Sequence, residues 1–305
     1  MIGFALRRLG LALVVALLVS AASFALIFIA GDPAIVLAGQ SGRAQDAEYL
    51  RVLYGLDRPW IVQYADWLGR ALRGDFGRSL YFNLPVRAIL FERIPVTLIL
   101  GCAALSFGLA LAVPLAIAAA VRPDSAIDRL ALFLAVVGQA IPGFWLGLML
   151  MIVFGVWLGW TPISGTDTWA GYVLPTIVLG YTVMPSLMRI LRTGMIDVLG
   201  SDYIRAARAK GLLSPRILFV HALRNAALPV VSLAAVQFGV LLSGSIVIES
   251  VFALNGVGRL AWESILRSDL PVVQAIILVF SLTYVLLTLA ADLINAWLDP
   301  RILEA

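Results

Sequence analysis

The residues best suited to chemistry lie together in one polar segment, Asp202–Asn225, which separates two long apolar stretches. It contains five cationic side chains: Arg205, Arg208, Lys210, Arg216 and Arg224. Placing these five groups at the centre of a bilayer would cost about 12–18 kcal/mol, at roughly 2.5–3.5 kcal/mol each. The segment is therefore expected to lie in water or against another protein, where guanidinium groups pair with acidic groups or carbonyl oxygens.

The same segment carries the local signals of a helical hairpin. Ser201 or Asp202 can cap a first helix, and Gly211 can end it. Ser214 followed by Pro215 is typical of the N-cap and first position of a second helix. We therefore predict two short helices joined at a glycine.

Few residues remain for catalysis or metal binding. Lys210 is the single lysine and precedes Gly211, so the chain lacks the Gly-Lys-Ser/Thr phosphate loop of an ATPase. His221 is the single histidine and Cys102 the single cysteine, which excludes motifs within one chain that need two of either. We expect a non-catalytic chain with no metal site and no cofactor.

The rest of the chain is strongly apolar. Of its 305 residues, 62% are hydrophobic and 13% charged, and the mean hydropathy is +0.99; soluble proteins have about 25% charged residues. Crossing a bilayer takes ~20 apolar residues. Stretches of about that length or longer lie at 9–30, 95–121, 130–160, 171–188, 226–249 and 272–297. We predict an all-α polytopic membrane protein with six transmembrane helices.

Two of these stretches have special features. Residues 9–30 are too long for the apolar part of a cleaved signal peptide, so we interpret them as a retained first span. Residues 130–160 exceed one straight crossing and contain Pro142-Gly143, which predicts a tilted or kinked helix.

Arginine placement in the short loops indicates the orientation. With the N-terminus inside, the short outer loops hold Arg259 and Arg267, and the other basic residues outside 31–94 face inward. Both termini and the polar hairpin are then cytoplasmic. The first outer loop, 31–94, carries eight arginines, but loops of that length follow the rule poorly.

Part of this first outer loop has helical periodicity. One face holds Trp60, Tyr64, Trp67 and Ala71, and the opposite face holds Gln63, Asp66, Arg70 and Arg73. This pattern predicts an amphipathic helix along the outer interface, with its aromatic side chains at headgroup depth. The alternative is that the helix packs against the outer surface of a partner.

Polar residues within the spans are sparse. Glu249 and Asp292 lie toward span ends, which favours boundary or capping roles over a proton relay. Neutral polar groups either hold helices together or line a solute path. The candidates for a path are Gln139, Gln237, Ser243 and Ser245.

Short motifs follow one another along nearly the whole chain. They are Arg7-Arg8-Leu9, Gly31-Asp32-Pro33, Gly55-Leu56-Asp57-Arg58-Pro59, Gly74-Asp75-Phe76-Gly77, Pro142-Gly143-Phe144-Trp145, the hairpin 202–225, Gly256-Val257-Gly258-Arg259, Pro271-Val272-Val273-Gln274 and Asp299-Pro300-Arg301. In this order they resemble the inner-membrane permease subunits of binding-protein-dependent ABC importers, in the dipeptide, oligopeptide and nickel branch.

The resemblance implies a type I ABC importer permease fold in a bacterial inner (plasma) membrane. Its first part, 1–94, would hold the first span and a periplasmic segment with the amphipathic helix, and 95–305 a five-helix core with the coupling loop 201–225. The implied partners are a related second permease subunit forming a heterodimer, two ABC ATPases, and a periplasmic or lipid-anchored substrate-binding protein. Membrane lipid is a further contact, and no nucleic acid is expected.

Solute identity stays open within this class. The resemblance favours di- and oligopeptides, with nickel chelates or glutathione as alternatives. A rival from another class is a self-sufficient secondary carrier, which would move solute without ATPase partners.

The hairpin resembles the cytoplasmic Glu-Ala-Ala…Gly loop by which such permeases dock into a cleft of the ATPase. Arg205 stands where the wider family has Glu, followed by Ala206 and Ala207, and Gly211 occupies the turn. The residues expected to couple to the ATPase are Asp202, Tyr203, Arg205, Ala206, Ala207, Lys210 and Gly211. The alternative is that the basic residues bind anionic lipid headgroups.

The resemblance also places the segment Phe252–Arg259 opposite the substrate-binding protein. Within it, Leu254-Asn255-Gly256 replaces the commoner Trp-Pro-Gly. Because Asn-Gly readily adopts turn conformations, we expect the tight turn to be kept.

Overall fold

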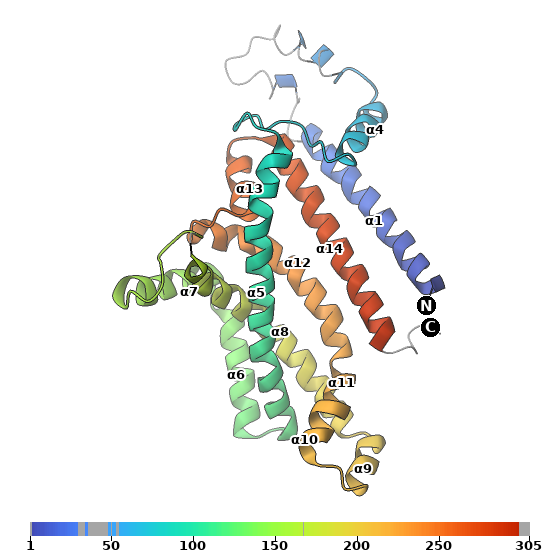
Figure 1. Ribbon diagram of the computed structural model, residues 1–305, viewed down its shortest axis with the longest axis vertical. Helices are drawn as coiled ribbons and strands as arrows, with labels where there is room; N and C mark the ends of the chain where they lie inside the picture. The colour runs from blue at the N-terminus through green and yellow to red at the C-terminus, as the bar shows by residue number, and fades with distance from the viewer. Residues whose placement is uncertain are drawn as a thin grey trace.

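A computed structural model describes residues 2–29, 34–35, 48–49, 51–52, 55–166 and 168–298. Its helices are α1 (Ile2–Ile29), α4 (Trp60–Ala71), α5 (Val86–Val121), α6 (Ala126–Ala140), α7 (Gly143–Leu150), η1 (Met151–Trp157), η2 (Trp169–Tyr172), α8 (Val173–Leu199), α9 (Asp202–Ala209), α10 (Ser214–Arg216), η3 (Ile217–Ala222), α11 (Leu223–Ala226), α12 (Leu228–Val251), α13 (Val257–Leu266) and α14 (Leu270–Leu298) (Figure 1). The all-α prediction is confirmed. The motifs at 31–33 and 299–301 lie outside the described residues.

Among the described residues, five helices are long and apolar enough to cross a membrane: α1, α5, α8 together with η2, α12 and α14. A sixth crossing results if α6 and the continuous α7–η1 helix are counted together. These two helices are bent by 97° relative to one another. The prediction of a kink in 130–160 is confirmed in its place, Pro142-Gly143, but two separate helices lie on either side of it instead of one kinked helix.

Local backbone geometry explains this break. Pro142 has no N–H to continue the helical ladder, and its ring drives the preceding residue out of the helical region. Ile141 is accordingly extended, with φ −83° and ψ 121°, and Pro142 is extended as well. Two consecutive extended residues let α7 leave nearly at right angles to α6, and Figure 1 shows α7 projecting sideways from the bundle.

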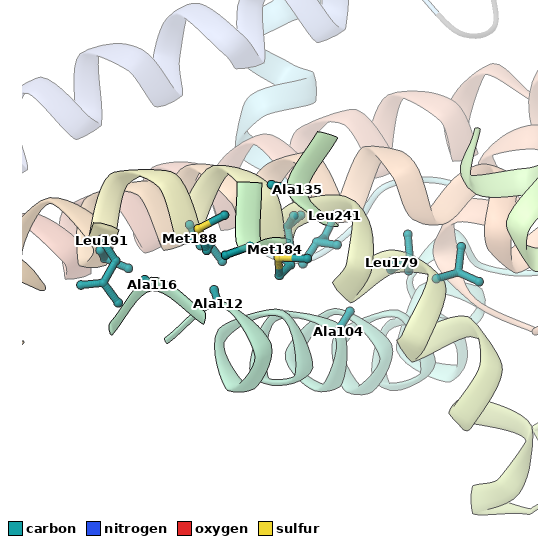
Figure 2. Close-up of a cluster of buried hydrophobic side chains, with 14 of the residues drawn as sticks. Ala104, Ala112, Ala116, Ala135, Leu179, Met184, Met188, Leu191 and Leu241 are labelled. Carbon is teal, nitrogen blue, oxygen red and sulfur yellow. The ribbon is translucent and has the colours of Figure 1, made fainter. Parts of the chain in front are cut away.

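The core is built around the contact between α5 and α8. Small side chains of α5 such as Ala104, Ala112 and Ala116 are buried, and in Figure 2 they lie alongside Met184, Met188 and Leu191 of α8. Where the two helices come closest, a Cβ atom at Gly180 would lie 2.6 Å from the carbonyl oxygen of Ala104. Without a hydrophobic drive in lipid, such close backbone contact is what holds helices together.

The amphipathic helix α4 forms as predicted, but its aromatic face contacts this chain's own helices. Tyr64 and Trp67 pack with Phe24 of α1, and Leu278 of α14 completes the cluster. The Tyr64 hydroxyl also lies 2.6 Å from the Oγ of Ser20 on α1. Trp67 is therefore buried, and of the four residues predicted to face headgroups or a partner, Trp60 is left strongly exposed.

The first turns of α1 and the last turns of α14 lie on the same side of the molecule. Arg8 and Asp292 form an ion pair between these helices at 3.0 Å. In Figure 1, α9 and α10 lie at the lower end of the molecule, whereas α4 and α13 lie in its upper part. The polar hairpin is thus at the opposite end of the bundle from α4 and α13.

Candidate functional site

The polar hairpin begins directly where α8 ends. Ser201 is extended, with φ −74° and ψ 155°, and takes the N-cap position of α9 as predicted. Its hydroxyl, however, donates backward to the carbonyl of Val198 at 2.6 Å and caps no N–H of α9. The negative carboxylate of Asp202 in the first turn interacts favourably with the positive N-terminal end of the helix dipole. It also forms an ion pair with Arg205 one turn later.

Helix α9 is attached to the rest of the protein on one face. Ile204 is its single buried residue and is fully inaccessible to solvent. Helix α9 packs against η3, in which Ile217 and Ala222 are also buried. The expected coupling residues other than Ala207, which is half-buried, are exposed: Asp202, Tyr203, Arg205, Ala206, Lys210 and Gly211. The hairpin therefore presents most of its first helix to the surroundings.

Gly211 makes the turn of the hairpin, as predicted. Its φ is +78°, and its N–H donates to the carbonyl of Arg208 at 2.9 Å. Nothing lies within 4 Å of the position that a Cβ atom would take. The backbone conformation, rather than lack of space, is what favours glycine here.

The second helix starts one residue earlier than predicted. Leu213 takes the extended N-cap conformation, and Ser214 is already the first residue of α10. Pro215 still lies in the first turn, where a missing N–H costs nothing. The chain then continues through the π-helix η3 into α11, a change of helix type that no sequence pattern indicated.

The two arms of the hairpin are joined by a side-chain hydrogen bond. Asn225 donates through Nδ2 to the hydroxyl of Tyr203 at 2.8 Å and to the carbonyl of His221 at 3.1 Å. His221 is half-buried. No local pattern indicates this role of Asn225, because Tyr203 lies 22 residues away along the chain. This bond restrains the hairpin beyond what its glycine turn provides.

The hairpin exposes apolar side chains beside its charges. Leu213 is 76% exposed and Phe219 58% exposed. Arg208, Lys210, Arg216 and Arg224 are exposed too, and in the described part of the chain none of them forms an ion pair. Exposed apolar groups next to uncompensated cations are typical of a surface that contacts another protein.

A cavity separates the hairpin from the end of α5. Its volume is ≈ 320 Å³, and its lining includes Val121 at the end of α5 and Gly200, Arg208, Ser214 and Ile217 from the hairpin and its junction with α8. The hairpin is thus attached chiefly through α8 and α11 and has open space on the α5 side.

The candidate residues for a solute path lie on two helices, Gln139 on α6 and the other three on α12. Gln139 is exposed in the last turn of α6, Ser243 is exposed on α12, and Gln237 of α12 is half-buried. Ser245 is 2% exposed, and its hydroxyl donates to the carbonyl of Leu242 at 2.8 Å. Within the described ranges, no group of three or more His, Cys, Asp or Glu side chains is placed to hold a metal ion.

Comparison with known proteins adds a family context to this geometry. Residues 112–304 match the family model described as binding-protein-dependent transport system inner membrane component. Residues 1–101 match the model for the N-terminal part of such membrane components.

Two curated relatives carry the same name, glutathione transport system permease protein GsiC. The protein from Salmonella typhimurium (strain LT2) is 40% identical over 304 residues, covering 99% of both chains. The protein from Escherichia coli (strain K12) is 41% identical over 272 residues, covering 89% of both.

Among solved structures, an inward-facing MetNI methionine ABC transporter is similar in fold. Its matching chain is 19% identical with a TM-score of 0.57, and the match covers 69% of this chain and 96% of that one.

Proposed function

This chain belongs to the inner-membrane components of binding-protein-dependent transport systems, and from that premise we propose that it forms half of an importer's path for glutathione or similar short peptides. The choice of solute rests on the two GsiC relatives, whose name specifies glutathione. Glutathione, an alternative at the level of sequence, is thereby favoured over nickel chelates. Longer peptides remain the second candidate through the family resemblance.

The observation that carries the proposal is the form of the hairpin 202–225. One face of α9 is anchored through Ile204, while Tyr203, Lys210 and Leu213 are exposed. Such a protruding helix with apolar and cationic groups suits the cleft of a separate ATPase. We assign the ATP hydrolysis to that partner, since this chain lacks a phosphate-binding loop.

The full importer would then contain two permease subunits, two ATPases and an external binding protein. The hairpin follows α8 directly, and α8 packs tightly on α5 at Gly180. Movement of the hairpin on ATP binding is therefore passed to the central helix pair. Alternating closure of the two hairpins would switch the path between outward and inward access.

This assembly fixes the orientation of the chain. The hairpin must face the cytosol to meet an ATPase, and the outer segment with α4 then faces the opposite compartment. Both chain termini are accordingly proposed to be cytoplasmic. The ion pair between Arg8 in the first part of α1 and Asp292 in the last part of α14 supports placing them on one side.

Reconstitution into proteoliposomes tests the proposal. The chain with its second permease subunit, its ATPases and its binding protein is expected to accumulate labelled glutathione when ATP is enclosed on the hairpin side. The same vesicles are compared with labelled dipeptide and nickel as competing solutes. Uptake by this chain alone under an ion gradient would instead identify a secondary carrier.

A further inference from the structure

Glu249 near the end of α12 is a buried acidic residue to which the transport function assigns no role. Its side chain is completely inaccessible to solvent. It accepts a hydrogen bond on Oε1 from the hydroxyl of Thr97 on α5, at 2.7 Å. On Oε2 it accepts the backbone N–H of Arg259 in α13, at 2.9 Å. One carboxylate thus contacts three helices: its own, α5 and α13.

These contacts supply the N-terminal cap that α13 lacks. The N-cap residue of α13 is Gly256, which has no side chain to satisfy the free N–H groups of the first turn. The N–H of Val257 donates to the Thr97 hydroxyl at 2.8 Å, and the N–H of Arg259 donates to Glu249. The negative carboxylate also suits the positive end of the helix. Helix α13 is therefore capped by α5 and α12.

The glycines of this segment make the arrangement possible. A Cβ atom at Gly256 would lie 2.5 Å from the carboxyl carbon of Glu249. A Cβ atom at Gly258 would lie 2.8 Å from the Cα atom of Ile246 on α12. Both distances are shorter than real side chains tolerate, so the Gly-Val-Gly sequence is what lets the chain reach the carboxylate.

A second contact joins the same elements. Arg93, one helical turn before Thr97 on α5, donates to the side-chain oxygen of Asn255 at 3.2 Å. We refer to residues 252–266 as the outer lip. Its inner face is buried, whereas Asn255, Trp262, Ile265 and Leu266 are exposed. Hydrogen bonds thus hold the buried face of the lip to α5, whereas its other face is exposed to solvent.

Helix α5 extends from these contacts to the end of the molecule that holds the hairpin, with Pro95 and Pro114 inside it. Of its 36 residues, the part from Thr97 to Val121 spans about 36 Å at 1.5 Å per residue. Its last residue, Val121, lines the cavity next to the hairpin together with Arg208. Because this cavity separates α5 from the hairpin, a displacement of α5 reaches the hairpin through α8, on which α5 packs and which leads directly into α9.

We propose that Glu249 is a positioning residue that holds the outer lip against α5. Contact of the external binding protein with the lip is then passed along α5 and, through its packing on α8, to the cytoplasmic hairpin. The inference rests on the proposed function. It adds a named route by which the external partner stimulates ATP hydrolysis on the opposite side of the membrane.

The first experiment measures the distance between the lip and α5 by double electron–electron resonance on the assembled transporter. In a Cys102→Ser background, spin labels are placed at the exposed positions Phe91→Cys on α5 and Trp262→Cys on the lip. The reference pair is Phe91→Cys with Val247→Cys on α12. Glu249→Gln and Thr97→Val are expected to broaden or shift the 91–262 distance while the 91–247 distance stays as in wild type.

The second experiment measures ATP hydrolysis with and without the binding protein loaded with glutathione. Glu249→Gln and Thr97→Val are expected to reduce the stimulation ratio about fivefold or more, a typical strength of coupling between distant sites. The matched control is Ser250→Ala, because Ser250 is the exposed neighbour whose hydroxyl bonds within α12 to Ile246. It is expected to keep the wild-type ratio.

An unchanged 91–262 distance in both variants would overturn the proposal, as would full stimulation despite a changed distance. Gly256→Ala offers an independent approach, since it displaces the carboxylate without removing it, and it should reproduce the Glu249→Gln result. Failure of the wild-type complex to hydrolyse ATP would instead contradict the proposed function, and the distance measurement would still decide whether Glu249 holds the lip against α5.

Discussion

Arg192 of α8 donates two hydrogen bonds to the carboxylate of Asp128 on α6, each at 2.6 Å. Asp128 is 2% exposed, and it also accepts the backbone N–H of Asp124 at 2.9 Å. The pair thus fixes the turn between α5 and α6 to α8, nearly three helical turns before the hairpin begins. Every oxygen of the carboxylate is occupied, which is the condition under which a buried charge pair is tolerated.

The first prediction concerns this pair. Asp128→Ala leaves a largely buried guanidinium without its partner, and the expected loss of stability is about 3–5 kcal/mol. Replacing both residues, as Asp128→Leu with Arg192→Met, removes the uncompensated charge and is expected to restore most of that loss. Thermal unfolding of the purified protein in detergent measures both. Equal melting temperatures for the single and double variants would contradict the interpretation.

The second prediction concerns the hairpin turn. Gly211 has φ +78° with open space around it, so a side chain there is strained by the backbone alone. Gly211→Ala is expected to weaken ATPase binding more than Gly211→Asn does, because asparagine adopts left-handed conformations more readily. Co-purification of the ATPase with each variant gives the comparison. A clash-based effect would rank the two substitutions by size instead, with asparagine the worse.

The third prediction separates ATPase docking from lipid binding. Lys210→Glu and Arg216→Glu reverse exposed charges of the hairpin, and each is expected to weaken ATPase binding roughly fivefold, less at high salt. The matched control is Arg122→Glu, an exposed arginine in the turn between α5 and α6. Similar losses in all three variants would favour a general role in contacting anionic lipids. The measurement is ATPase affinity in lipid nanodiscs.

The fourth prediction concerns the contact of α5 with α8. A methyl group at Gly180 would lie 2.6 Å from the backbone oxygen of Ala104, which cannot rotate away. Gly180→Ala is therefore expected to destabilise the protein by about 1–3 kcal/mol. Gly244→Ala on α12 is the control, since the nearest atom there is a leucine methyl at 3.8 Å. In denaturant, the free energy of unfolding of the control is expected to equal that of wild type. Equal losses of stability in Gly180→Ala and Gly244→Ala would refute the steric explanation.

The fifth prediction concerns the outer segment that precedes α5. Asp269 is fully buried, accepts the hydroxyl of Ser79, and accepts the backbone N–H of Leu80 at 3.1 Å. Asp269→Ala is expected to accelerate amide hydrogen exchange over residues 79–84, because their anchor is lost. Asp75→Ala removes an exposed local turn contact to Gly77 and serves as the control. Exchange that stays slow without Asp269 would mean that the segment is held by other contacts.

Features set by neighbouring residues were predictable from the sequence. The spans follow from uninterrupted apolar stretches, and the break at Pro142-Gly143 follows from a missing N–H. The glycine turn of the hairpin likewise depends on the conformation of one residue, Gly211. Each of these outcomes requires information from within a few residues along the chain. For that reason the amino-acid sequence is sufficient to predict the fold class and the hairpin.

Features set by distant residues needed the tertiary structure. Pro142 permits the bend between α6 and α7. The angle of 97° itself depends on how these two helices pack against the rest of the protein. Asp128 and Arg192 are 64 residues apart, and Thr97 and Val257 are 160 residues apart. No periodicity links such residues, because their meeting depends on which helices lie side by side. Sequence alone therefore established that Glu249 lies at a span end, whereas the fold decided that it caps α13.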